Sequence, residues 1–194
     1  MKIINLSRFA NAMVVGTLIL GLTTSLWGDD GKENEDAKEE WGPLSEGCNL
    51  SIQVEKNKFN YCQPIILKIT LKNSDKTPLM FADTGPESDF SIIVKNDEGK
   101  IVPLTAYGKK RSDTTFPKII YMNVQITLQF KEKREYFLLV NRMHDMSLKG
   151  TYSITVKRSG FMREGKRLGE VVSNTIKVEV RGDPPNPFKE SEDE

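Results

Sequence analysis

The chain has 194 residues, of which 38% are hydrophobic, and its formal net charge is +1. Its two cysteines and one histidine lie too far apart in sequence for a zinc site, and no other metal or cofactor is expected. Aromatic and basic residues are not interleaved, so nucleic-acid binding is not expected either.

The first 28 residues have the pattern of a secretory signal peptide. Lys2 and Arg8 precede an uncharged apolar run over residues 12–22, and small residues near 25–28 offer a cleavage point. This run suits a signal peptide and is too short to cross a hydrocarbon core of about 30 Å. We therefore expect an exported protein, secreted or periplasmic. It would meet the membrane only through this segment, if the segment stays uncleaved as an N-terminal anchor.

Two acidic segments flank the rest of the chain. Residues 29–40 hold seven acidic and two basic side chains, and residues 182–194 are rich in proline and then acidic. Such segments bury too little apolar surface to offset the entropy of ordering, so both are expected to be disordered. Residues 41–181 are expected to form a single domain. Its surplus of basic side chains would attract anionic partners or simply keep the surface soluble.

Within this domain, apolar side chains recur at every second position, which predicts half-buried β-strands. The alternating segments are CNLSIQVE, PIILKITLKN, DFSIIVKN, NVQITLQF, EYFLLV, TYSITVKR and NTIKVEV. Turn residues such as Asn96-Asp97-Glu98-Gly99 separate them. The expected fold is all-β, an immunoglobulin-like antiparallel β-sandwich of about seven to nine strands, with a closed barrel as the alternative.

Cys48 and Cys62 are the only cysteines, and export would place them where thiols oxidise. A bridge between them would close a loop of about 15 residues and stabilise the fold by about 3 kcal/mol in the chain-entropy model. We expect this disulfide, with two free thiols as the alternative.

The segment PLMFADTGPESDF contains Asp83-Thr84-Gly85, the tripeptide in which an aspartic protease presents a catalytic carboxylate. That mechanism needs two carboxylates that share a proton, and the chain has one Asp-Thr-Gly. Asp, Gly and Pro are also ordinary turn residues. We interpret the segment as a loop between two strands, in which Asp83 accepts local backbone hydrogen bonds and Asp83→Asn costs little stability.

His144 and the residues after it are interpreted as structural. No G-x-S-x-G turn occurs, so the pair His144-Asp145 does not predict a catalytic triad. Asp145, Gly150 and Tyr152 instead fit a tyrosine corner at the start of a strand. The tyrosine hydroxyl would bond back to the preceding loop, and Gly150 would supply backbone freedom.

The connection KRSGFMREGKRLGE between the last two strands is predicted to be a long, exposed hairpin. Basic side chains crowd it around an apolar tip, which suits an acidic protein segment, an anionic polysaccharide or a lipid headgroup. The candidate binding residues are Lys157, Arg158, Phe161, Met162, Arg163, Lys166 and Arg167. A solvated hairpin without a ligand is the alternative.

Four stretches carry a resemblance to known domains. They are WGPLSEGCNLSIQVEKNKFNYCQPIILKITLKNSDKTPL, SDFSIIVKNDEGK, LLVNRMHDMSLKGTYSITVKR and SNTIKVEV. Over residues 41–180 they resemble a group of secreted, mostly uncharacterised bacterial Ig-like domains. More loosely, they are similar to the bacterial intracellular proteinase inhibitor domain, itself a small β-sandwich. The resemblance implies a β-sandwich fold and export, and it carries no catalytic residue.

Together these patterns predict a non-enzymatic, extracytoplasmic binding or structural module. Its partner would be a protein or an anionic envelope polymer, bound through loops or a sheet edge. The alternative is a proteinase inhibitor of the cell envelope that inserts a loop into a protease cleft.

Overall fold

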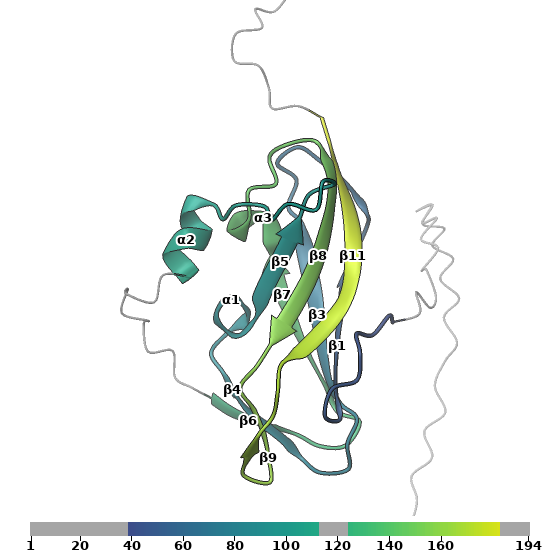
Figure 1. Cartoon of the computed structure of the whole chain (residues 1–194), viewed down its shortest axis with the longest axis vertical. Coiled ribbons are helices and arrows are strands. Elements are labelled where there is room, and N and C mark those ends of the chain that lie inside the picture. The colour runs from purple at the N-terminus through teal and green to yellow at the C-terminus, as the bar shows by residue number, and fades with distance from the viewer. Residues whose placement is uncertain (1–38, 113–123, 183–194) are drawn as a thin grey trace, which may run out of the picture. The chain divides into compact units, whose positions relative to one another are not determined.

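The computed structural model describes residues 39–112 and 124–182 (Figure 1). The predicted signal peptide, the acidic linker up to residue 38 and the C-terminal tail from residue 183 lie outside the described residues. Among the residues described, no helix is long and apolar enough to cross a membrane.

Seven strands form the larger sheet, in the order β5-β8-β11-β1-β3-β7, with β2 paired to β11. Their bounds are β1 (Cys48–Val54), β2 (Lys58–Asn60), β3 (Ile66–Asn73), β5 (Ser91–Lys95), β7 (Lys133–Leu139), β8 (Gly150–Arg158) and β11 (Val171–Arg181). Most neighbours are antiparallel, while β11 runs parallel to both β1 and β2.

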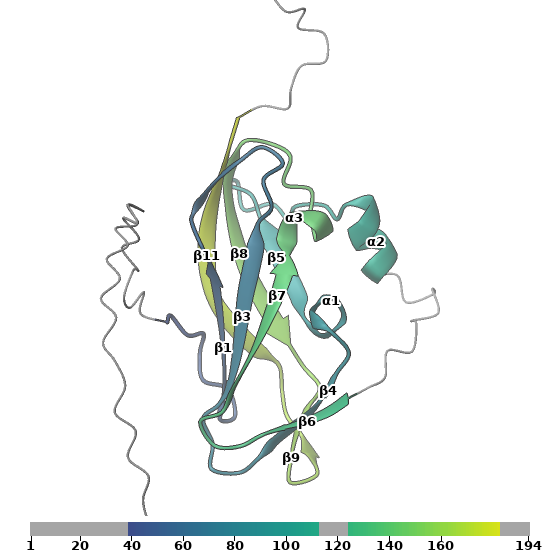
Figure 2. The ribbon, with the colours of Figure 1, turned by 180° about the vertical axis from the view of Figure 1, so that it is seen from behind.

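A smaller sheet has the order β10-β9-β4-β6. It consists of β4 (Leu79–Asp83), β6 (Val124–Leu128), β9 (Phe161–Arg163) and β10 (Lys166–Arg167). Three short helices complete the described chain: α1 (Pro86–Asp89), α2 (Ala106–Ser112) and α3 (Val140–Met143). They lie on the side where β5 and β7 end the larger sheet (Figure 1, Figure 2).

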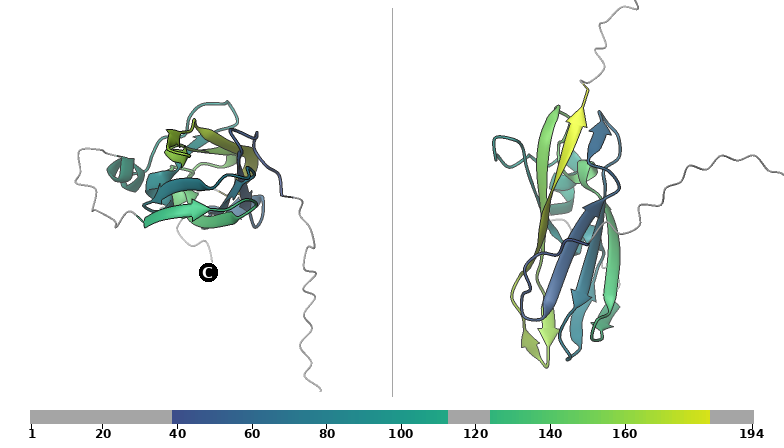
Figure 3. Two further views of the ribbon diagram at one scale, coloured as in Figure 1. Left: turned by 90° about the horizontal axis from the view of Figure 1, so that it is seen from below. Right: turned by 90° about the vertical axis from the view of Figure 1, so that its right-hand side faces the viewer.

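The larger sheet curls into a half-barrel, so that β5, β8 and β11 face β1, β3 and β7 (Figure 3). Alternate side chains point into the space between these halves, and Leu50, Ile69 and Ile154 are fully buried there. Burial at every second position is what the period-two pattern predicts. The prediction of an all-β fold is confirmed, although the described residues form eleven strands rather than about seven to nine. The larger sheet is a single, continuous, curled one.

Strand β11 joins the two halves through a bulge. A single bridge, Leu50↔Ser173, connects β11 to β1, and the register of β11 against β8 shifts between Val172 and Thr175. The Asn174 side chain replaces missing backbone contacts with β1, because it accepts a hydrogen bond from the Ile52 amide at 2.8 Å and donates one to the Ile52 carbonyl at 3.1 Å. Bulges bend and twist a strand, which suits the point where this sheet curls.

Asn73, at the end of β3, ties the two sheets together. It is fully buried, and its amide group donates to the carbonyls of Thr77 at 2.9 Å and Leu128 at 3.0 Å. Its side-chain oxygen accepts hydrogen bonds from the Asp75 amide at 3.1 Å and the Arg163 guanidinium at 2.9 Å. Because both amide donors and the oxygen are engaged, the side chain fixes the chain path at this junction.

The predicted corner at the start of β8 has the contact expected of it. The Tyr152 hydroxyl donates to the Leu148 carbonyl at 2.6 Å, and the ring is buried. Gly150 has a φ of +153°. Asp145 is exposed and accepts a hydrogen bond from the Ser147 amide at 3.3 Å, which closes the turn before the corner.

The structure does not form the expected disulfide. Cys48 and Cys62 are free thiols, Cys48 buried and Cys62 exposed. Cys48 pairs with Asn73 at one end of the β1–β3 ladder, whereas Cys62 precedes β3 at the other end, where Val54 pairs with Leu67. Seven residues of strand separate these ends by about 20 Å, and a disulfide requires Cα atoms within about 7 Å. The prediction overlooked that β1 carries the chain from one end of the ladder to the other before Cys62 is reached.

Candidate binding surface

Two of the seven candidate hairpin residues are core residues. Arg158, the last residue of β8, is 3% exposed and forms an ion pair with Asp89 at 3.1 Å. Its guanidinium also donates to the Ala82 carbonyl at 2.8 Å and the Tyr136 hydroxyl at 3.1 Å. Phe161 is fully buried and packs edge-on against Phe81, with ring centroids 5.6 Å apart. Neither Arg158 nor Phe161 is available to a ligand.

The remaining hairpin residues are also partly engaged. Arg163 bonds to the Glu46 carbonyl and to Asn73, and it lies 3.5 Å from an Asp75 carboxylate oxygen. Lys157 forms an ion pair with Glu170 at 2.8 Å. Of the seven candidate residues, Met162, Lys166 and Arg167 are exposed, so the predicted binding residues do not form one continuous surface.

Asp83 and Asp89 of the Asp-Thr-Gly segment form a charged cluster with two arginines. Asp83 pairs with Arg134 at 2.6 Å, and Asp89 pairs with Arg158. Tyr136 lies between the two pairs and accepts hydrogen bonds from both arginines at 3.1 Å. Burial raises the pKa of the Tyr136 hydroxyl above its ordinary value. Each carboxylate has its own guanidinium partner, so the cluster lacks the shared proton of an aspartic protease dyad.

The local hydrogen bond predicted for Asp83 is present, because its carboxylate accepts from the Gly85 amide at 3.2 Å. However, its side chain is only 12% exposed and anchors Arg134. Asp83→Asn would remove the carboxylate from an ion pair whose arginine is 40% exposed, so the expectation of a small cost in stability stays a prediction.

His144 is buried, and its Nδ1 lies 3.4 Å from the Val102 carbonyl. Burial lowers the pKa of the imidazole below its ordinary value. Over the described part of the chain, no group of three or more His, Cys, Asp or Glu residues is placed to hold a metal ion.

The structure exposes a different feature, the outer edge of β7. The Val140 amide donates to the Ile65 carbonyl, and the Glu132 carbonyl accepts from the Asn73 amide. The backbone N–H and C=O groups of residues 132 and 140 are therefore directed toward β3. Because successive residues of a strand face opposite sides, Lys133, Glu135, Phe137 and Leu139 direct their backbone groups away from β3. In the part of the chain that the structure describes, no backbone hydrogen bond joins the outward-facing groups of these four residues to another segment.

Large apolar side chains lie exposed next to this edge. Phe137 is 62% exposed and Ile66, on the neighbouring strand, is 55% exposed. Lys68 is paired with Phe137 in the β3–β7 ladder, so all three share the outer face of the sheet. A shallow hollow of about 300 Å³ lies here, lined by Gln53, Val54, Glu55, Ile66, Lys68 and Phe137.

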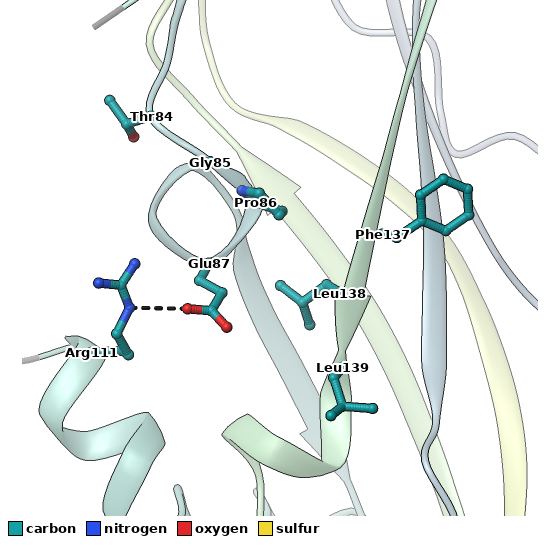
Figure 4. Close-up of a pocket in the computed structure, with 8 residues that line it drawn as sticks. All are labelled: Thr84, Gly85, Pro86, Glu87, Arg111, Phe137, Leu138 and Leu139. Atoms are coloured by element: carbon teal, nitrogen blue, oxygen red, sulfur yellow. Dashed lines mark ion pairs between the residues drawn. The ribbon is translucent and has the colours of Figure 1, made fainter. Parts of the chain in front are cut away.

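A groove runs along the other side of the β7 edge (Figure 4). Its volume is about 250 Å³, and residues 137–139 of β7 form one wall. Residues 84–87, at the start of α1, form the opposite wall, together with Arg111, whose guanidinium pairs with Glu87 at 3.1 Å. Leu138 points toward residues 86 and 87, whereas Phe137 lies on the other side of the strand (Figure 4). We call the β7 edge, the Phe137–Ile66 pair and this groove the β7 surface.

The opposite end of the larger sheet, at β5, is protected, unlike the end at β7. Lys95 of β5 forms a bridge with Ile101, and the Val102 amide donates to the Val94 carbonyl at 2.9 Å. The chain thus folds back over the edge of β5. Natural proteins usually shield their edge strands in this or similar ways.

The comparisons with known proteins do not identify a family. No family model matches the chain, and no curated protein matches it. Among solved structures, it is similar to structural genomics target SoR45 (TM-score 0.41, 10% identity, covering 70% of this chain and 88% of that one). It is also similar to the C-terminal domain of wzt (TM-score 0.41, 12% identity, covering 77% and 81%). A third is the Pseudomonas fluorescens alkylpurine DNA glycosylase AlkC bound to DNA with an abasic site analog (TM-score 0.32, 16% identity, covering 69% and 30%). At these TM-scores the similarities support no conclusion about function.

Proposed function

We propose that the chain is a non-enzymatic binding module and that it binds its partner through the β7 surface. The observation that carries this proposal is the pair Phe137 and Ile66, both more than half exposed beside a sheet edge that pairs with no further strand among the described residues. Contiguous apolar groups on a protein surface are typical of interaction sites. Aromatic side chains contribute strongly at such sites because they bury a large area at a small entropic cost.

The charges favour a protein partner over an anionic polymer. On the outer face, Lys68 and Glu135 neutralise each other at 2.7 Å. In the hairpin, Lys157 and Arg158 are paired with carboxylates, which leaves Lys166 and Arg167 as the two exposed cations among the candidate residues. A polyanion needs several free cations in a row, whereas an apolar surface with paired charges suits a polypeptide.

We further propose that the module acts outside the cytoplasm and that its fold is an immunoglobulin-like sandwich. The signal-peptide pattern of residues 1–28 supports export. The two facing halves of the curled sheet and the corner at Tyr152 support the sandwich.

The proposal is tested by capture of partners from a cell-envelope extract on the full chain. Phe137→Ser should reduce recovery at least tenfold, because it removes the largest exposed side chain of the β7 surface. Phe130→Ser is the matched control, since Phe130 is also an exposed phenylalanine, at 43%, and lies outside that surface. Equal recovery by both variants would refute the assignment of the binding surface.

Proteinase inhibition is the second candidate from the sequence, and it is separated by a different assay. An inhibitor of the expected kind presents an extended loop to a protease cleft. In the structure, the β9–β10 hairpin is closed by Glu164 and Gly165, both with positive φ, as in a tight two-residue turn. We therefore expect no inhibition when casein hydrolysis is followed with a panel of proteases. Stable complex formation with any of them would favour inhibition instead.

A further inference from the structure

We propose that the partner of the β7 surface is an extended polypeptide segment that adds to the larger sheet as a strand alongside β7. This inference rests on the proposed function and specifies both the mode of binding and the chemistry of the partner. The partner segment would carry apolar side chains at alternate positions.

The first argument is the backbone polarity of β7. Lys133, Glu135, Phe137 and Leu139 each direct one N–H donor and one C=O acceptor toward the free edge. These groups repeat every two residues, or about 6.7 Å. A second polypeptide strand presents the same groups at the same spacing, which neither a polysaccharide nor a lipid headgroup does.

The second argument is the side-chain environment on the outer face. An added strand would place every second side chain on that face, next to Phe137 and within reach of Ile66. The hollow of about 300 Å³ beside them can receive an apolar group. Since Lys68 and Glu135 already form an ion pair, this part of the face has no unbalanced charge to attract a charged side chain.

The third argument is that the two halves of the β7 edge differ in how well they are protected against pairing with another strand. Charged side chains on an edge strand discourage pairing with other chains, and Lys133 and Glu135 provide such charges in the first half of β7. The second half has Phe137 and Leu139 instead, and there the start of α1 forms a groove of about 250 Å³ along the edge. The partner segment would enter this groove beside Leu139 and Phe137 and continue along β7 as far as the N–H group of Glu135, with one backbone edge against the strand.

The test uses a proline substitution that removes an edge donor without removing a ladder bond. Glu135 directs its N–H away from β3, so Glu135→Pro should leave the β3–β7 hydrogen bonds in place. Glu135→Ala is the matched control, because it loses the same side chain and the ion pair to Lys68 but keeps the N–H group. Urea unfolding of both variants establishes that they are folded before binding is measured.

The probe is a phage-displayed library of random 12-residue peptides, selected on the full chain. We expect selected peptides with alternating apolar residues, at least tenfold weaker binding to Glu135→Pro, and a change of less than threefold with Glu135→Ala. N-methylation of the backbone of a selected peptide should abolish binding at every second position and be tolerated between them. This last measurement uses the unaltered protein, so it remains decisive if Glu135→Pro does not fold.

Several results would overturn strand addition. These are a lack of enriched peptides, equal binding by Glu135→Pro and Glu135→Ala, or N-methylation effects without alternation. A dimer of the full chain in light scattering that Glu135→Pro dissociates would assign the edge to a second copy instead. If capture from the envelope extract depends on Phe137 but not on the Glu135 amide, the proposed binding function is retained and strand addition is wrong. If the full chain captures no partner, the proposed function itself is wrong.

Discussion

Replacing Arg158 by methionine should destabilise the protein severely. The substitution removes the ion pair to Asp89 and the hydrogen bonds to Ala82 and Tyr136, at a position where the side chains of Arg158 and Asp89 are 2% and 8% exposed. It also removes the cation from above the rings of Phe81, Phe90, Tyr136 and Phe161, whose centroids lie 4.5 to 5.5 Å from the guanidinium carbon.

The magnitude follows from what remains behind. Removing one partner of a buried ion pair costs about 3–5 kcal/mol, chiefly because the other charge is left uncompensated. Asp89 keeps hydrogen bonds from the amide and hydroxyl of Thr84, and methionine fills part of the space. We therefore expect a loss of about 3–4 kcal/mol, a large share of the roughly 5–15 kcal/mol that stabilises a typical domain.

The assay is equilibrium unfolding in urea, followed by tryptophan fluorescence, with the slope of the transition checked for constancy. Lys157→Met is the control, because Lys157 lies beside Arg158 but its ion pair is at the surface, and it should change stability by less than about 1 kcal/mol. The double variant Arg158→Met/Asp89→Asn should recover about 1–2 kcal/mol relative to Arg158→Met. A cost below about 1 kcal/mol for Arg158→Met, or strictly additive effects in the double variant, would refute the reasoning.

Three further predictions follow from other buried groups. Asn73→Ala should cost about 2–4 kcal/mol, because it leaves buried backbone carbonyls unpaired, and Asn57→Ala, at an exposed position, should cost far less in the same urea assay. Iodoacetamide should modify only Cys62 in the folded protein and both thiols in urea, because Cys48 is buried and burial raises the pKa of its thiol. Mass spectrometry that shows two rapidly formed adducts on the folded protein, or none, would contradict this. Because burial lowers the pKa of His144, the unfolded chain binds a proton that the folded chain does not, and stability should fall as the pH drops below about 6.5 toward the folded pKa. In His144→Phe, the urea midpoint should therefore change less between pH 7 and pH 5 than it does in the unaltered protein. An equal change with pH in both proteins would exclude His144 as the cause.

Six of the seven strands of the larger sheet were predictable because their signal is local, whereas the three-residue strand β2 was not predicted. In β3 and β8, alternate apolar side chains are buried as the period-two pattern requires. The same pattern contained the signal for Arg158 that the sequence interpretation missed. Arg158 follows Tyr152, Ile154 and Val156 at intervals of two, so it shares their buried face. The charge of Arg158 suggested a position on the surface, whereas its place in the alternating pattern indicated a position in the core.

Other features depend on contacts that no local pattern encodes. Phe161 is buried because it pairs with Phe81, which is far away in the sequence, in the register of β4 and β9. The β7 surface is exposed because of the order of strands in the sheet, which leaves β7 at an end. The residue that could have indicated this surface is Phe137. In the alternating pattern of β7 it lies on the face of the strand away from the buried Tyr136 and Leu138.

The central place of β11 has a consequence for how the protein folds. This strand is the last one in the described chain, yet it lies between β8 and β1, and its Asn174 bonds to Ile52. Contacts between such distant parts of a chain make folding slow. Until β11 is in place, β8 and β1 each present an unpaired edge, so a chain truncated before Val171 would expose two aggregation-prone strands at once. We therefore expect the two halves of the sheet to become one cooperative unit only when β11 pairs with both β8 and β1.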